Sequence, residues 1–179
     1  MKTIEISLNK EGSVKGAIKE LRAYRKSINN KTRSFVSRLI TVGIRTARLN
    51  TGKYGEVIAF ERDIHQKDNV IIGKLIAVGQ PIYGMRKNEL VEANPVLLAE
   101  FGSGWEAKVL DKPKGLNVGQ GTFPGQTHAF NPQGWYYVSV EDGETYHTYG
   151  ERPTFPMHAA MLAMLFDIDR IAKEVFGNG

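Results

Sequence analysis

The chain has 179 residues, of which 41% are hydrophobic and none is cysteine. This length supports one buried core and no shift in composition divides it, so we expect a single domain over residues 1–179. The lack of cysteine excludes disulfides, thiolate metal ligands and cysteine nucleophiles. No apolar run approaches the roughly 20 residues that cross a bilayer, and the first residues lack the pattern of a secretory leader. We therefore expect a soluble cytoplasmic protein with no membrane partner.

Positive charge is concentrated near the start of the chain. Residues 10–53 contain twelve lysines and arginines but only two acidic residues, Glu11 and Glu20, which gives this segment a net charge of +10. Because the whole chain carries +5, the remainder carries −5. Such a division is typical of an arm that faces nucleic acid, or of two oppositely charged surfaces that attract each other between copies.

The basic segment has the spacing of a helix. Before this segment, alternating apolar residues predict a short strand over residues 1–9. From Ser13, which suits an N-cap, apolar residues then recur at helical intervals up to Ala47. We expect one long helix or two consecutive helices that end before Thr51, with a basic outer face.

The middle of the chain has the composition of β-structure. Three short segments are predicted strands: 56–60 (EVIAF), 70–79 (VIIGKLIAVG) and 94–102 (NPVLLAEFG). Together with the helices they predict an α+β fold.

A hairpin is predicted over residues 135–149. Aromatic and β-branched residues alternate there on both sides of Asp142-Gly143, a pair that favours a two-residue turn. A turn at this position places Tyr136 opposite Tyr149, and Val138 opposite His147.

Two further segments complete the chain. Residues 102–134 contain seven glycines and three prolines without a sustained period, which is typical of a functional or partner-ordered loop. A final helix is predicted from about Pro156 to Phe176, closed by Gly177. Its first half is apolar nearly all round, so we expect it to be buried on several sides or covered by another subunit. If its main stripe is core, Ile168→Ala should cost about 2 to 5 kcal/mol.

Ser103 is the one candidate nucleophile that stands on a glycine-rich turn. A nucleophile elbow requires glycines two residues before and after the serine, and Phe101 and Trp105 occupy those positions. We interpret the stretch as a corner at the end of a strand. The glycines of residues 119–125 likewise lack the Lys-Ser/Thr pair of a phosphate-binding loop.

No metal or acid–base constellation emerges from the remaining polar residues. Asp63 and His65 lie two apart on a predicted strand and could share a metal, but exposure to solvent is the simpler interpretation. Asp167 and Asp169 lie two apart on a helix and do not face each other. None of the histidines has HExxH spacing: His65, His128, His147 and His158. We expect no catalytic site, no metal and no cofactor.

Four motifs in chain order carry a resemblance to a known family. They are LLAEFGSG at 97–104, GQGTFPGQTH at 119–128, GWYY at 134–137 and TYGERPTFPMHAAM at 148–161. The C-terminal half thereby resembles neck or tail-completion proteins of tailed phages, the siphophage and prophage proteins described as minor capsid or head-tail joining proteins. A basic helix before the sheet also fits that family.

The resemblance implies a non-enzymatic role in joining the DNA-filled head to the tail. The fold would have an N-terminal and a C-terminal helix packed on an antiparallel sheet. Copies would associate head to tail and close into a ring between the portal or connector proteins and the tail. The protein would occur in the host cytoplasm during assembly and then in the virion, with possible DNA contact in the lumen.

The resemblance also suggests residues for these contacts. The glycines and aromatic anchors expected to order against a neighbouring subunit are Phe101, Gly102, Gly104, Trp105, Phe123, Phe130, Trp135 and Phe155. The basic face expected to meet an acidic patch or DNA consists of Arg22, Arg25, Lys26, Arg33, Arg38, Arg45 and Arg48.

Two alternatives stay open. The basic segment supplies the sequence-independent phosphate attraction of a non-specific DNA-binding accessory protein, although it has no helix-turn-helix pattern and no aromatic residues on its basic face. A small hydrolase that uses Ser103 and a histidine is the third class, and it has little support in the sequence.

Overall fold

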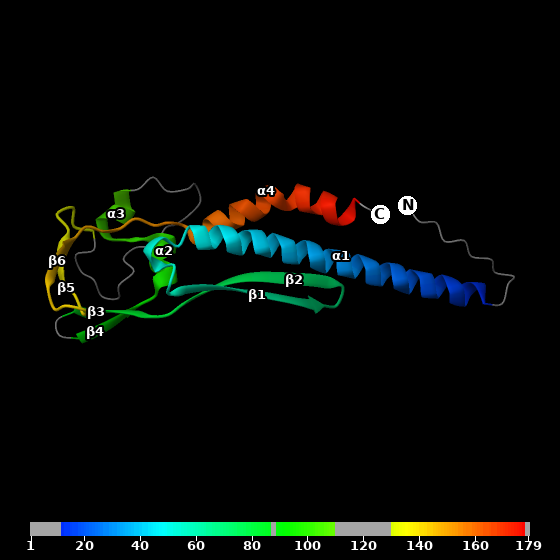
Figure 1. Cartoon of the computed structure of the whole chain (residues 1–179), viewed down its shortest axis with the longest axis horizontal. Helices are drawn as coiled ribbons and strands as arrows, with labels where there is room; N and C mark the ends of the chain where they lie inside the picture. The colour runs from blue at the N-terminus through cyan, green and yellow to red at the C-terminus, as the bar shows by residue number, and fades with distance from the viewer. Residues whose placement is uncertain (1–11, 87–88, 110–129, 178–179) are drawn as a thin grey trace.

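The computed structural model describes residues 12–86, 89–109 and 130–177. The strand expected over residues 1–9 lies outside these ranges, as does the middle of the Gly/Pro-rich segment with Phe123 and His128. In the described chain, two helices and a two-stranded ribbon run side by side, and the smaller elements gather at one end (Figure 1). The predicted α+β class is confirmed.

The first helix, α1 (Ser13–Leu49), is a single element of 37 residues. Of the two arrangements that the sequence allowed, the long continuous helix is the one formed. Gly12 occupies the N-cap position with a φ of 95°, so Ser13 is the first helical residue and not the cap. The helix ends before Thr51, as predicted.

A long antiparallel ribbon packs against α1. It consists of β1 (Ile58–Lys67) and β2 (Val70–Gly79), both predicted, although β1 extends further than the sequence indicated. Gly73 of β2 lies so close to α1 that a Cβ atom there would approach Val36 to 2.3 Å and Ile40 to 2.7 Å. The missing side chain therefore allows the close contact between ribbon and helix.

The last helix, α4 (Pro156–Phe176), has the predicted bounds and packs along α1 (Figure 1). The two helices approach closely at Gly43 of α1, where a Cβ atom would lie 2.9 Å from the sulfur of Met164. Ile171 is 1% exposed and Ile168 is 38% exposed, so the expectation that Ile168 belongs to the core is wrong. Gly177 follows the helix with a φ of −71°, without using the left-handed conformation open to glycine.

Residues 94–102 form a helix, and the strand predicted there is wrong. In α2 (Pro95–Phe101) the side chain of Asn94 accepts a hydrogen bond from the backbone N–H of Val96 at 2.9 Å, and a proline occupies the first turn. An asparagine cap followed by proline favours a helix start. These two residues outweigh the short apolar run that suggested a strand, because such runs occur in both kinds of element.

The predicted hairpin is present with a different register. β5 (Trp135–Val138) pairs with β6 (Thr145–Thr148), and Tyr136 faces His147 where the sequence suggested Tyr149. The loop is longer than two residues because the N–H of Ser139 donates to the carbonyl oxygen of Glu144 at 2.8 Å. Since the shift is two residues, each side chain stays on its predicted face of the hairpin.

Several short elements were not predicted. A 3₁₀ turn, η1 (Gly52–Tyr54), follows α1, and β3 (Ile82–Arg86) pairs with β4 (Glu89–Ala93). A short helix, α3 (Gly104–Val109), occupies the start of the segment expected to be a loop, and β7 (Gly150–Glu151) precedes α4. Six of the described strands, β1 to β6, thus form three two-stranded sheets and not one continuous sheet.

The core lies where the end of α1, the start of β1, α2 and the start of α4 converge. Small residues dominate the helix contacts, which lets the elements approach closely. The buried members of this cluster are Ala47, Tyr54, Ile58, Phe60, Ala93, Leu98, Ala99 and Ala160.

Candidate assembly surfaces

Glu100 joins α2 to the start of α4. Its side chain is 7% exposed, and its two carboxylate oxygens accept the backbone N–H groups of Met157 at 2.7 Å and His158 at 3.1 Å. The residue before α4, Phe155, has a φ of 54° and supplies no side-chain cap. Glu100 therefore satisfies the unpaired donors at the helix start and places a negative charge at the positive end of its dipole.

The glycines of the 97–104 motif permit close contact with the segment that leads into α4. Ser103 forms an antiparallel β-bridge with Glu151, and Gly104 forms one with Gly150. Gly102 and Gly104 have φ angles of 67° and 65°, which favour glycine. Ser103 is 3% exposed, so the structure places it inside a joint between segments and not on an open turn.

Glu151 also holds η1, the turn that follows α1. Its carboxylate accepts hydrogen bonds from the hydroxyl of Tyr54 and the ammonium group of Lys53. Burial, and then the hydrogen bond to the Glu151 carboxylate, raise the pKa of the Tyr54 hydroxyl. Tyr54 therefore stays protonated and donates this bond throughout the neutral range.

The residues proposed as aromatic anchors are partly buried within the chain. Trp135 covers Gly104, where a Cβ atom would lie 2.3 Å from the indole ring. Phe101, Trp105, Phe130 and Phe155 are likewise half-buried, and Gly102 and Gly104 are buried. Phe123 lies outside the described residues. A contact between these residues and a neighbouring subunit stays a prediction.

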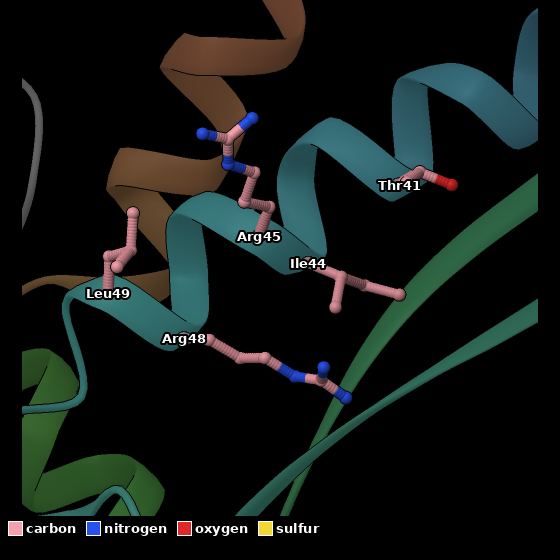
Figure 2. Close-up of a pocket in the computed structure, with 5 residues that line it drawn as sticks. All are labelled: Thr41, Ile44, Arg45, Arg48 and Leu49. Carbon is pink, nitrogen blue, oxygen red and sulfur yellow. The ribbon is translucent and has the colours of Figure 1, made fainter.

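The seven residues of the proposed basic face do not share one face of α1. Arg38 forms an ion pair with Glu174 of α4, and Arg25 donates a hydrogen bond to Asn69 in the turn of the ribbon. Arg22, Lys26 and Arg33 follow one another at intervals of four and seven residues, which places them on a common side of the helix. Arg45 and Arg48 point away from each other, as Figure 2 shows.

Arg45 and Arg48 flank a shallow open groove near the end of α1. The groove has a volume of about 430 Å³ and is lined by Thr41, Ile44, Arg45, Arg48 and Leu49 (Figure 2). Neither arginine has an ion pair among the described residues. A mixed surface of this kind, with aliphatic side chains between free guanidinium groups, suits a partner with apolar and acidic groups.

The outer side of α4 exposes a patch of large apolar side chains. Phe166 is 84% exposed and Leu165 is 56% exposed, with Met161 and Leu162 beside them at 45% and 39%. The inner side of the same helix packs on α1. The sequence left two expectations for this helix: burial on several sides, or cover by another subunit. The chain itself covers one side, and the other side remains open to a partner.

The β5–β6 hairpin carries a second exposed surface, rich in aromatic residues. Tyr136 is 73% exposed, and its ring centroid lies 4.7 Å from that of His147; the rings of Tyr137 and Tyr146 are 5.8 Å apart. Every residue from 140 to 147 is exposed. Exposed tyrosines held on a strand pair are frequent anchors of protein interfaces.

The titratable residues considered in the sequence do not assemble into a metal site in the described part of the chain. Asp63 and His65 are neighbours on β1, with 3.1 Å between Oδ2 and Nδ1, but no third ligand accompanies them among the described residues. Asp167 forms an ion pair with Arg170 at 2.7 Å. His147 makes a 2.8 Å hydrogen bond with the carbonyl oxygen of Gln133.

Sequence reasoning missed the structural role of Glu100 and the acidic, aromatic surface of the hairpin. The first could have been suspected, because the apolar run of residues 96–101 contains one acidic residue and must satisfy it when buried. The second required the register of the hairpin. Within residues 12–86, 89–109 and 130–177, no helix has the length and apolar character to span a bilayer.

Comparison with known proteins adds no relative to this description. No protein-family model, no curated protein and no solved structure matches the chain.

Proposed function

We propose that this chain is a structural protein of tailed-phage morphogenesis, of the neck or tail-completion type, that joins head and tail through self-association and contacts with connector, portal-side or tail proteins. The four motifs quoted above suggest the family. The observation that carries the proposal is the apolar patch of α4 formed by Met161, Leu162, Leu165 and Phe166. Side chains of this size gather on the surface of a soluble protein mainly where a partner binds.

The arrangement around the patch supports a rigid docking element. The inner side of α4 is fixed on α1, and Glu100 holds the start of the helix. A rigid face loses little conformational entropy on binding, so more of the energy of apolar burial appears as affinity. The motif residues 100–104 and 150–158 would then serve to fix α4 relative to the rest of the chain.

A direct test compares Phe166→Glu with Lys173→Ala, a control at an exposed position on the same helix. We expect the wild-type chain to bind purified connector or tail proteins in native mass spectrometry, and Phe166→Glu to lose that binding. Both variants should keep the wild-type thermal midpoint, because both positions are exposed. Partner binding that is unchanged in Phe166→Glu would contradict the role of the patch.

The placement in a phage particle needs its own test. Mass spectrometry of phage particles purified from a strain that carries the gene should detect the chain at a fixed ratio to the portal protein. Its consistent absence from such particles, with portal, head and tail genes absent from its surroundings, would contradict the proposal. On this proposal the chain first occurs in the host cytoplasm and then in the virion.

DNA binding is the second candidate function. It is favoured by the charge of α1, which contains ten lysines and arginines and one glutamate. Arg22, Lys26 and Arg33 form no ion pair within the described residues, so their charge is available to phosphates. A mobility shift of duplex DNA that weakens with salt, and that Arg22→Glu with Lys26→Glu abolishes, would support this function. The absence of binding at low salt would exclude it.

A further inference from the structure

The N-terminal part of α1 projects beyond the elements that pack against it. The ribbon reaches the helix as far as Arg25, which bonds to Asn69, and α4 ends where the ring of Phe176 lies 5.9 Å from that of Phe35. Figure 1 shows α1 continuing past both. Every residue from 18 to 28 is exposed.

This projecting segment is amphipathic. Val14, Ile18, Leu21 and Tyr24 follow the spacing of one helix face and are between 43% and 56% exposed. A helix that contributes so little to its own core is marginal in water, because packing of an apolar face supplies most helix stability. The apolar face of the segment is therefore suited to burial against a partner.

The charges of the segment restrict the kind of partner. Residues 14–28 contain five lysines and arginines and one glutamate, for a net charge of +4. A shallow pocket of about 360 Å³ lies among Lys15, Ile18, Lys19 and Arg22, so cationic and apolar groups share one surface. No ion pair within the described residues includes these three cations. A partner surface that offers apolar side chains with carboxylates would fit.

The opposite end of the same chain offers that surface. Residues 135–149 contain Glu141, Asp142 and Glu144 and no lysine or arginine, which gives a net charge of −3. These acids and the tyrosines beside them, Tyr136 and Tyr137, are exposed. A hydrogen bond from Tyr146 lowers the pKa of Asp142, which keeps its carboxylate charged in the neutral range.

We propose that the projecting segment of α1, residues 13–28, docks on the β5–β6 hairpin of a second copy, so that copies associate head to tail. The two surfaces lie at opposite ends of the long axis of the molecule (Figure 1), so the helix segment cannot reach the hairpin of its own chain. Each copy would offer its helix to one neighbour and its hairpin to another. Such heterologous contacts produce a closed ring or a filament. The inference rests on the proposed function and identifies the surfaces through which self-association occurs.

Other occupants of the helix fit less well. If two projecting segments packed together, each would carry a net charge of +4, and the two would repel each other. The apolar patch of α4 is available, but two nearby acids, Asp167 and Glu174, are already paired with arginines of the same chain. Duplex DNA would take the cations but leave the apolar stripe in water.

A charge exchange between the two surfaces tests the docking. The helix variant combines Lys19→Glu, Arg22→Glu and Lys26→Glu, and the hairpin variant combines Glu141→Lys and Glu144→Lys. Asp142 is left in place because its carboxylate accepts the N–H of Glu144 and the hydroxyl of Tyr146. The control variant, Glu56→Lys with Glu61→Lys, makes the same charge change on exposed acids elsewhere.

In sedimentation velocity we expect each surface variant alone to associate at least roughly tenfold more weakly than wild type. An equimolar mixture of the two variants should regain association, because each reversed surface then meets a surface of opposite charge. The control variant should associate as wild type does. The docking would be overturned if either surface variant associated as wild type does, or if the mixture did not regain association. The phage role would not be affected, because mass spectrometry of particles tests it separately. A wild-type chain that is monomeric at every concentration would also overturn it.

Cross-linking provides a second readout, since the chain has no cysteine of its own. A mixture of Leu21→Cys and Tyr137→Cys copies should form disulfide-linked dimers, and Leu21→Cys alone should not. Predominant self-cross-linking of Leu21→Cys, or preferential cross-linking of it to Phe166→Cys copies, would overturn the docking. If the helix variant loses duplex DNA binding but associates as wild type does, the projecting segment serves nucleic acid instead.

Discussion

The carboxylate of Glu100 in α2 accepts a hydrogen bond from the backbone N–H of Met157 in the first turn of α4, at 2.7 Å. One buried side chain thus caps the N-terminus of a helix that begins more than fifty residues further along the chain. The same region contains the glycines that let residues 103–104 pair with residues 150–151. The motif residues around Ser103 therefore have a structural explanation that requires no chemistry.

Removal of the Glu100 cap should destabilise the fold. Glu100→Ala leaves two helix N–H groups without an acceptor, and we expect a loss of about 1 to 3 kcal/mol in the free energy of unfolding. Glu100→Gln, which retains one acceptor oxygen, should lose less. The measurement is urea denaturation followed by circular dichroism, with Glu61→Gln as the control at an exposed position. Equal stability of Glu100→Ala and the control would contradict the capping role.

The two isoleucines of α4 should differ in their contribution to stability. Ile171 is 1% exposed, so Ile171→Ala should cost about 2 to 5 kcal/mol. Ile168 is 38% exposed, so the same substitution there should cost clearly less. Chemical denaturation of both variants measures the difference. A larger loss for Ile168→Ala would mean that α4 is rotated relative to the packing described here.

Gly104 should not tolerate a side chain. A Cβ atom at this position would lie 2.3 Å from the ring of Trp135, and the φ of 65° is unfavourable for alanine. Gly143→Ala is the matched control, because its φ is 74° but no atom lies within 4 Å. The backbone conformation should lower the free energy of unfolding by about 1 kcal/mol in both variants. The clash should lower it by at least about 1 kcal/mol more in Gly104→Ala. Equal thermal midpoints would show that Trp135 does not cover Gly104.

Tyr54 should make stability depend on alkaline pH. Its folded-state pKa is raised, so above about pH 10 the unfolded chain releases this proton while the folded chain retains it. The folded state then binds more protons, and stability falls as the pH rises further. Unfolding curves from pH 8 to 11 should show a shallower decline for Tyr54→Phe than for wild type. The pKa of Tyr146 is raised as well, by its hydrogen bond to Asp142, so a Tyr146→Phe variant is needed as a parallel control.

Long periodic elements could be predicted from the sequence, and their ends were marked by local residues. α1 and α4 each repeat an apolar pattern over many turns, so their existence and their C-terminal limits follow from composition and spacing. Which face of α4 is buried could not be read in the same way. Its first half is apolar nearly all round, and the position of α1 decides that Ile171 is inside and Phe166 outside.

The errors arise where two local preferences compete. Asn94-Pro95 favours a helix start, whereas the apolar run after it resembles a strand, and the cap decides the outcome. In the hairpin, Asp142-Gly143 favours a tight turn, but Asp142 instead accepts the N–H of Glu144 inside a longer loop. Neither competition can be resolved without the hydrogen bonds that the folded chain forms.

The candidate surfaces depend on arrangement more than on residue type. The sequence reveals that α1 is basic and that residues 135–149 are aromatic and acidic. It does not reveal that the two lie at opposite ends of the molecule, or that the part of α1 before Arg25 extends past the ribbon. Exposure and distance between surfaces are properties of the packed chain, so composition alone could not supply them.

The packing of α1 against α4 also determines when the protein can fold during synthesis. The ion pair between Arg38 and Glu174 joins residues that lie 136 positions apart. A ribosome must therefore translate nearly all of the described chain before α4 can cover its side of α1. Until then the nascent helix exposes its apolar side chains, and contacts of such long range form slowly. Premature termination of translation would leave α1 uncovered, as a target for chaperones and proteases.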